Sequence, residues 1–70
     1  MEILVYKTNI HRTHDVEKVK PLFNKQSDIL KWHVDIEDKD RVLRVEARAD
    51  ISEKIVKLVS EAGYWCGELE

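Results

Sequence analysis

Cysteine, glycine and proline are scarce in this 70-residue chain, which contains one, two and one of them respectively. The single cysteine, Cys66, rules out an internal disulfide and any zinc site made only of cysteines. Two glycines leave no glycine-rich phosphate loop and no nucleophile elbow. No apolar segment approaches the roughly 20 residues that span a bilayer. We therefore expect a non-catalytic domain without a membrane span, stabilised by packing alone.

A strong excess of one charge sign is also absent, because 14 acidic residues stand against 12 basic ones. The two signs are interspersed, so no basic face forms that could follow a phosphate backbone, and nucleic acid is not expected as a partner. Carboxylates that alternate with lysine and arginine are typical of a solvated face rather than of an acid/base pair. The apolar stretch in MEILVYK is too short for a signal-peptide core, which favours the cytoplasm.

The hydrophobic fraction of 43% argues against disorder, and its spacing predicts regular elements. Apolar and β-favouring residues predict a strand over residues 3–10. After a polar stretch, Val16, Val19, Leu22 and Phe23 recur at helical spacing. Two expectations concern the ends of this helix: Asp15, or else Thr13, caps its first N–H groups, and Pro21 produces a kink or an early end.

The second half repeats the pattern with a hairpin in place of a single strand. Strict alternation over residues 30–36 and 43–47 predicts two strands joined by a polar turn at 37–40. Asp50 and Glu53 have the spacing of a capping box, with Asp50 accepting from the Glu53 amide. The helix that follows is expected to end at Gly63, and residues 65–70 form a short last strand.

This order of elements predicts one α+β domain over residues 1–70. It is the ferredoxin-like βαββαβ sandwich, a four-stranded antiparallel sheet in the order 4-1-3-2 with two helices on one face. Parity and helical spacing give the side chains expected to face the core: Leu4, Tyr6, Ile10, Val19, Leu22, Phe23, Trp32, Val34, Ile36, Leu43, Val45, Ile55, Leu58, Val59 and Ala62.

Three segments carry a resemblance to a known family. Residues 7–10 (KTNI), 32–36 (WHVDI) and 61–64 (EAGY) resemble the end of the first strand, the second strand and the end of the second helix of a heavy-metal-associated domain. This module occurs in copper chaperones and in the tails of metal-pumping ATPases. The resemblance covers nearly the whole chain and implies the same fold.

The resemblance also implies a Cys-x-x-Cys pair after the first strand, whose thiolates hold a soft ion such as Cu(I). Counted from Ile10 and from Val16 and Val19, those positions hold Arg12 and Asp15. Neither residue supplies a thiolate, and a guanidinium cannot be deprotonated to bind a cation. The sequence therefore predicts a degenerate form that has the fold without the thiolate site.

Other ligands could replace the missing thiolates. His11 and His14 could place two imidazoles on one Zn²⁺, Ni²⁺ or Cu²⁺ ion, with Cys66 as a third ligand. Parity instead turns Cys66 inward as a small apolar filler. No resident cofactor is expected, and an altered metal carrier or sensor is the alternative to a non-catalytic interaction module.

The open face of the sheet is the expected contact surface. Parity places Ile3, Val5, Val42 and Trp65 on the side away from the helices, and the strand order suggests that they adjoin one another. An apolar centre with a polar rim is typical of an interface. We therefore expect a protein partner, or a second copy in a homodimer, on this face.

Overall fold

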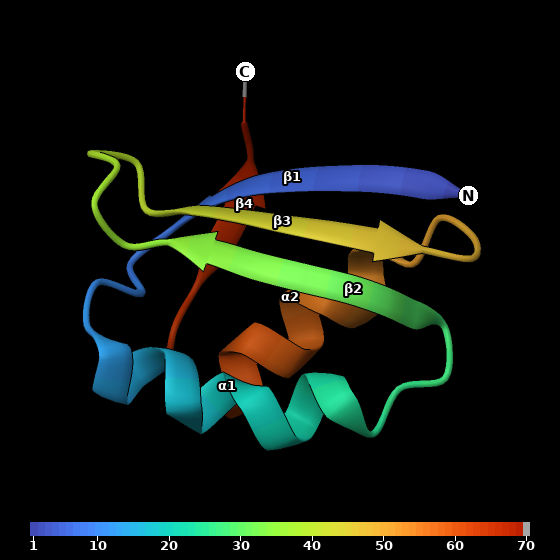
Figure 1. Cartoon of the computed structure of the whole chain (residues 1–70), viewed down its shortest axis with the longest axis horizontal. Coiled ribbons are helices and arrows are strands. Elements are labelled where there is room, and N and C mark those ends of the chain that lie inside the picture. The colour runs from blue at the N-terminus through green and yellow to red at the C-terminus, as the bar shows by residue number, and fades with distance from the viewer. Residues whose placement is uncertain (70) are drawn as a thin grey trace.

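The computed structural model describes residues 1–69 and confirms the ferredoxin-like fold (Figure 1). A four-stranded antiparallel sheet forms one layer and two helices lie together on one of its faces. The elements, in chain order, are β1 (Glu2–Thr8), α1 (Thr13–Asn24), β2 (Ile29–Asp35), β3 (Val42–Ala47), α2 (Ser52–Glu61) and β4 (Cys66–Glu68).

The sheet has the order β2-β3-β1-β4, which is the predicted 4-1-3-2 order read from the other edge. β1 pairs with β3 over five residues, from Glu2 opposite Ala47 to Tyr6 opposite Leu43. β4 pairs only with the second half of β1, from Tyr6 opposite Glu68 to Thr8 opposite Cys66. The first half of β1 therefore has a neighbouring strand on one side only.

β1 ends two residues earlier than predicted because the Thr8 side chain takes over the hydrogen bonding. Thr8 Oγ1 donates to the carbonyl oxygen of Arg41 at 2.6 Å and accepts from the Ile10 N–H at 3.0 Å. These bonds turn the chain out of the sheet. β4 likewise starts one residue late, since the Trp65 N–H donates to the side chain of Asn9 rather than to a strand; the predicted last residue, Glu70, lies outside the described residues.

The start of α1 differs from the prediction. The N-cap residue is Arg12, and no side chain caps the helix. Thr13 and Asp15 lie inside the first turn, where the Asp15 carboxylate accepts from the His11 N–H at 3.4 Å. Pro21 does not end the helix, which continues to Asn24. Pro21 itself is exposed on the outer side of the helix.

The start of α2 also corrects the predicted capping box. Asp50 Oδ1 accepts from both the N–H and the hydroxyl of Ser52, at 3.1 and 2.6 Å, and not from Glu53. The end of α2 is as predicted. Gly63 adopts a positive φ of 92°, its N–H donates to Ser60, and the Tyr64 N–H donates back to the Val59 carbonyl at 3.1 Å. This turn carries Tyr64 back toward α1.

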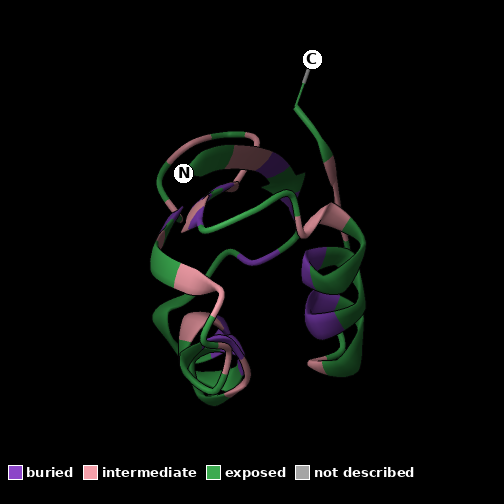
Figure 2. Ribbon diagram, turned by 90° about the vertical axis from the view of Figure 1, so that its right-hand side faces the viewer, coloured by how far each residue is buried: buried purple, intermediate pink, exposed green. Residues whose placement is uncertain are grey.

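The core lies between the sheet and the inner sides of both helices (Figure 2). Every side chain predicted to face inward is buried or packs against the buried cluster. Phe23 of α1 is fully buried and meets Trp32 of β2 edge to face, with ring centroids 5.0 Å apart. The Trp32 indole N–H donates to Asn24 Oδ1 at 3.1 Å, so this partly buried ring is also anchored at its polar end.

Candidate functional site

Residues 9–15, which cover the end of the first loop and the start of α1, are hydrogen-bonded to the loop between α2 and β4. Two hydrogen bonds join these loops, from Tyr64 Oη to Asp15 Oδ1 at 2.6 Å and from the Trp65 N–H to Asn9 Oδ1 at 2.9 Å. We refer to the residues that take part as the loop network, which consists of Asn9, His11, Arg12, Asp15, Tyr64 and Trp65.

Asp15 is the centre of the loop network. It is only 7% exposed, and its two oxygens accept from the Tyr64 hydroxyl and from the His11 N–H. The Tyr64 hydrogen bond, with the His11 N–H adding to it, holds the pKa of the Asp15 carboxyl below its ordinary value. The same bond raises the pKa of Tyr64. Asp15 is thus an ionised carboxylate, and each of its two oxygens already accepts one hydrogen bond within the chain.

His11 is similarly engaged. Its Nε2 lies 3.1 Å from Arg12 Nε, and because a guanidinium can only donate, Nε2 accepts. The ring proton is then on Nδ1, which points to the Asn9 carbonyl oxygen at 3.1 Å and lies 3.6 Å from Asp15 Oδ2. A metal ion at His11 would have to displace one of these contacts.

The predicted metal ligands do not converge. Within residues 1–69, no three His, Cys, Asp or Glu side chains come close enough together to hold a metal ion. His14 is exposed in the first turn of α1. Cys66 faces the core opposite Thr8, as its parity predicted, and burial raises the pKa of its thiol, which disfavours the thiolate that binds metal.

The open sheet face does not form the single patch that was predicted. Trp65 is 52% exposed, as expected, but it lies beside Asn9, which is one residue past the end of β1 and six residues along the chain from Ile3, or roughly 20 Å for an extended chain. Val42 continues the β3 register to the position opposite Lys7. The prediction placed these side chains on the correct face of the sheet but placed Trp65 at the wrong position along β1. The strand order alone does not show that so short a β4 pairs only with the far half of β1.

The structure brings a different side chain to the Ile3 end of this face. Leu69 follows β4 and is 39% exposed, and its N–H lies 3.4 Å from the Val5 carbonyl. Sequence parity contained the signal, because Leu69 has the same parity as Trp65. Asn9 and Tyr64 were missed for another reason: their roles depend on a contact between loops 49 to 56 residues apart.

No family model matches this chain, and no curated protein sequence does so significantly. The resemblance to heavy-metal-associated domains therefore rests on residues 7–10, 32–36 and 61–64. Neither helix of the described residues is long and apolar enough to cross a membrane.

The hydrogen bond between Asp15 and Tyr64 predicts a specific pH dependence. The lowered pKa of Asp15 means that its stabilisation is present above the ordinary value of 3.8 and is lost as the pH falls through the folded value. The raised pKa of Tyr64 means that stabilisation is present below 10.0 and is lost as the pH rises through the folded value. Tyr64→Phe should therefore lower the urea midpoint most between about pH 5 and 9.

The control for this prediction is Tyr64→Phe made in an Asp15→Asn background, where the ionised acceptor is absent. There the phenylalanine substitution should shift the urea midpoint much less. A shift of the same size in both backgrounds would show that the Tyr64 ring and not its hydrogen bond supports the loop.

Proposed function

We propose that this chain is a non-catalytic protein-interaction module, a degenerate heavy-metal-associated domain that has kept the fold and lost the thiolate metal site. One observation carries the proposal. Asp15, at the position of the family's second cysteine, is buried and bonded to Tyr64 and His11. Internal hydrogen bonds now order the loop that a metal ion would order in the family.

The proposed partner is a protein, or a second copy of this chain, and the proposed compartment is the cytoplasm. The partner contacts the open sheet face at its Ile3 end, where Ile3, Val5 and Leu69 cluster opposite Arg44 and Glu46. The three apolar side chains would form the centre of such an interface, and the charged side chains beside them would form its rim.

Native mass spectrometry of the tag-free chain with Zn²⁺, Ni²⁺ and Cu(I) tests this proposal. We expect no stoichiometric metal complex, and equally weak Cu(I) retention by the parent and by Cys66→Ser, because one thiol gives no chelate. The same spectra report the oligomeric state. A stoichiometric complex that resists a competing dithiol, and that His11→Ala or His14→Ala abolishes, would instead establish the alternative of a metal carrier or sensor.

A further inference from the structure

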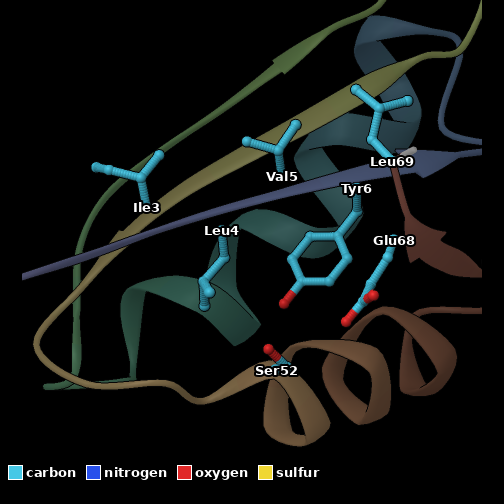
Figure 3. Close-up of a pocket in the computed structure, with 7 residues that line it drawn as sticks. All are labelled: Ile3, Leu4, Val5, Tyr6, Ser52, Glu68 and Leu69. Carbon is cyan, nitrogen blue, oxygen red and sulfur yellow. The ribbon is translucent and has the colours of Figure 1, made fainter.

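The outer edge of β2 is open to a further strand. Within residues 1–69, β2 pairs only with β3, and it is the edge strand that lies nearest α1 in Figure 1. The opposite edge of the sheet is formed by β4, where Ile3, Val5 and Leu69 point to the open side of β1 (Figure 3). The width of the sheet therefore separates Leu69, the last described residue, from the outer edge of β2.

The pairing with β3 shows which backbone groups of β2 face this outer edge. The Arg48 N–H donates to the Asp28 carbonyl at 2.9 Å, so Arg48 directs its backbone groups toward β2. Residues two apart in a strand face the same edge, so the even-numbered residues of β3 also face β2. Their partners are the odd-numbered residues within 31–35. Trp32 and Val34 therefore direct their N–H and C=O groups away from β3, toward the open edge.

β2 lacks the features that usually block an edge strand. Such strands are commonly protected by proline, by short length or by a charged side chain that points inward. β2 is seven residues long and contains no proline, and its inward-facing side chains include Trp32 and Val34. A register shift between Ile29 and Lys31 confines the regular part of the strand to residues 31–35. This regular part can accept another strand.

A hollow lies beside the β2 edge on the helix side of the sheet. Its volume is about 440 Å³, and its lining includes Val16 and Lys20 of α1 together with Trp32, Val34 and Ile36. Successive side chains of a strand point to opposite faces of the sheet, so every second side chain of an added strand would face this hollow. The apolar lining favours an added strand whose side chains on that face are apolar.

The sequence of β2 is complementary to itself. When two copies pair antiparallel about His33, Lys31 of each copy lies opposite Asp35 of the other. In the same register Trp32 lies opposite Val34, so apolar side chains meet on the helix face. Lys31 and Asp35 are exposed, and neither forms an ion pair within residues 1–69. Opposite charges directly across a pair of strands stabilise the pairing.

We propose that two copies of this chain pair antiparallel along their β2 edges, about a twofold axis at His33. The two four-stranded sheets then form one continuous sheet. Each of the two symmetric pairs of Trp32 and Val34 exchanges both of its backbone hydrogen bonds. The axis is perpendicular to the sheet, so all the helices lie on one side and both open faces on the other.

This inference goes beyond the proposed function and does not depend on it. The pairing uses the β2 edge and leaves the open sheet face at its Ile3 end free in both copies. Both of these surfaces then point to the same side of the dimer, where a partner protein can reach them.

Neighbouring registers are less complementary. A pairing centred one residue later would use Ile36, which lies beyond the end of β2 and whose carbonyl already accepts from Arg41 Nη1 at 2.9 Å. A pairing centred one residue earlier would place Lys31 opposite His33 and give the lysine no opposite charge. The charges therefore select the register centred on His33.

Sedimentation equilibrium of the tag-free chain from about 1 µM to 1 mM tests the inference. We expect a monomer–dimer equilibrium that depends on concentration in this range, because a contact between two strand edges is small for a stable dimer.

Amide hydrogen exchange locates the contact without any substitution. The amides of Trp32 and Val34 face the open edge, so their protection should rise with protein concentration. The amides of Lys31, His33 and Asp35 face β3 and should be protected at every concentration.

Charge reversal tests the register. Lys31→Glu and Asp35→Lys should each weaken the dimer about tenfold or more, because two symmetric pairs of opposite charges become pairs of like charges. An equimolar mixture of the two variants should associate again, since opposite charges then face each other across both pairs. Lys31 also lies opposite Glu46 of β3, so circular dichroism should first show that each variant is folded.

Lys57→Glu and Glu53→Lys are the matched controls. They make the same charge changes at exposed positions of α2, which packs against β4. Neither control should change the dimerisation constant, and mixing the two should have no effect.

A chain that stays monomeric at about 1 mM would overturn the inference. So would a dimer that Lys31→Glu and Asp35→Lys leave unchanged, or a mixture of these variants that does not associate. A dimer that Leu69→Lys dissociates, without protection of the Trp32 and Val34 amides, would place the second copy on the open sheet face and also overturn it. Stoichiometric metal binding would contradict the proposed function and leave the β2 pairing untouched.

Discussion

Phe23→Ala is expected to lower the free energy of unfolding by about 3–5 kcal/mol. The phenylalanine side chain is fully buried between α1 and the sheet, and its removal leaves a cavity that the neighbouring backbone cannot fill. The edge-to-face contact with Trp32 is lost as well. A domain of this length has a total stability of roughly 4–10 kcal/mol, so the variant should be close to unfolding at room temperature.

Urea denaturation followed by tryptophan fluorescence measures this effect. Phe23→Leu retains part of the side-chain volume, so it should fold and lose less stability than Phe23→Ala. If the alanine variant does not fold, the leucine variant still allows the loss of stability at this position to be measured. Val56→Ala removes methyl groups from an exposed position of α2 and should change the stability by about 0.5 kcal/mol or less. If Phe23→Ala lowered the free energy of unfolding as little as Val56→Ala does, the packing of α1 against the sheet described above would be contradicted.

Thr8→Val should cost about 1–3 kcal/mol although it keeps the shape of the side chain. The Thr8 hydroxyl accepts from the N–H of the fully buried Ile10 and donates to the Arg41 carbonyl, so valine leaves a buried donor and an acceptor without partners. Ile10 and Arg41 belong to different loops. The substitution should therefore loosen the end of β1 and the β2–β3 turn together.

Thr8→Ser is the matched control, because it keeps the hydroxyl and loses only a methyl group. Urea midpoints should place the serine variant closer to the parent than the valine variant. The reverse order would mean that burial of the methyl group, and not the two hydrogen bonds, accounts for the contribution of Thr8. Amide hydrogen exchange at Ile10 gives an independent reading, since its protection should fall only in the valine variant.

The fold was predictable because its signals are local and repeated. Alternation along residues 30–36 and 43–47 indicated two strands with one buried face, and the short turn between them restricted their pairing to a hairpin. Gly63 indicated the end of α2 because only a residue that tolerates positive φ suits that position. The right-handed crossover rule then determined the strand order.

The N-terminal ends of the helices and the position of Trp65 on the open sheet face were less predictable, because they depend on individual side-chain hydrogen bonds. Asp50 bonds to Ser52 and not to Glu53 because the N-cap residue of α2 is Ile51, one position later than a capping box at Asp50 requires, and this shift is not visible in the spacing. The position of Trp65 along β1 depends on where β4 begins to pair, which the Asn9 side chain decides.

The loop network also bears on the order in which the chain folds. Two of its hydrogen bonds join residues 49 and 56 positions apart, Asp15 to Tyr64 and Asn9 to Trp65. Closing loops of that length costs conformational entropy, which the intervening helices and hairpin must first reduce by bringing the segments together. Asp15 therefore gains its main hydrogen bond only after the α2 end has formed. A chain interrupted before Tyr64 would leave this carboxylate without that bond, so the hydrogen bond can form only in a chain extended beyond the end of α2.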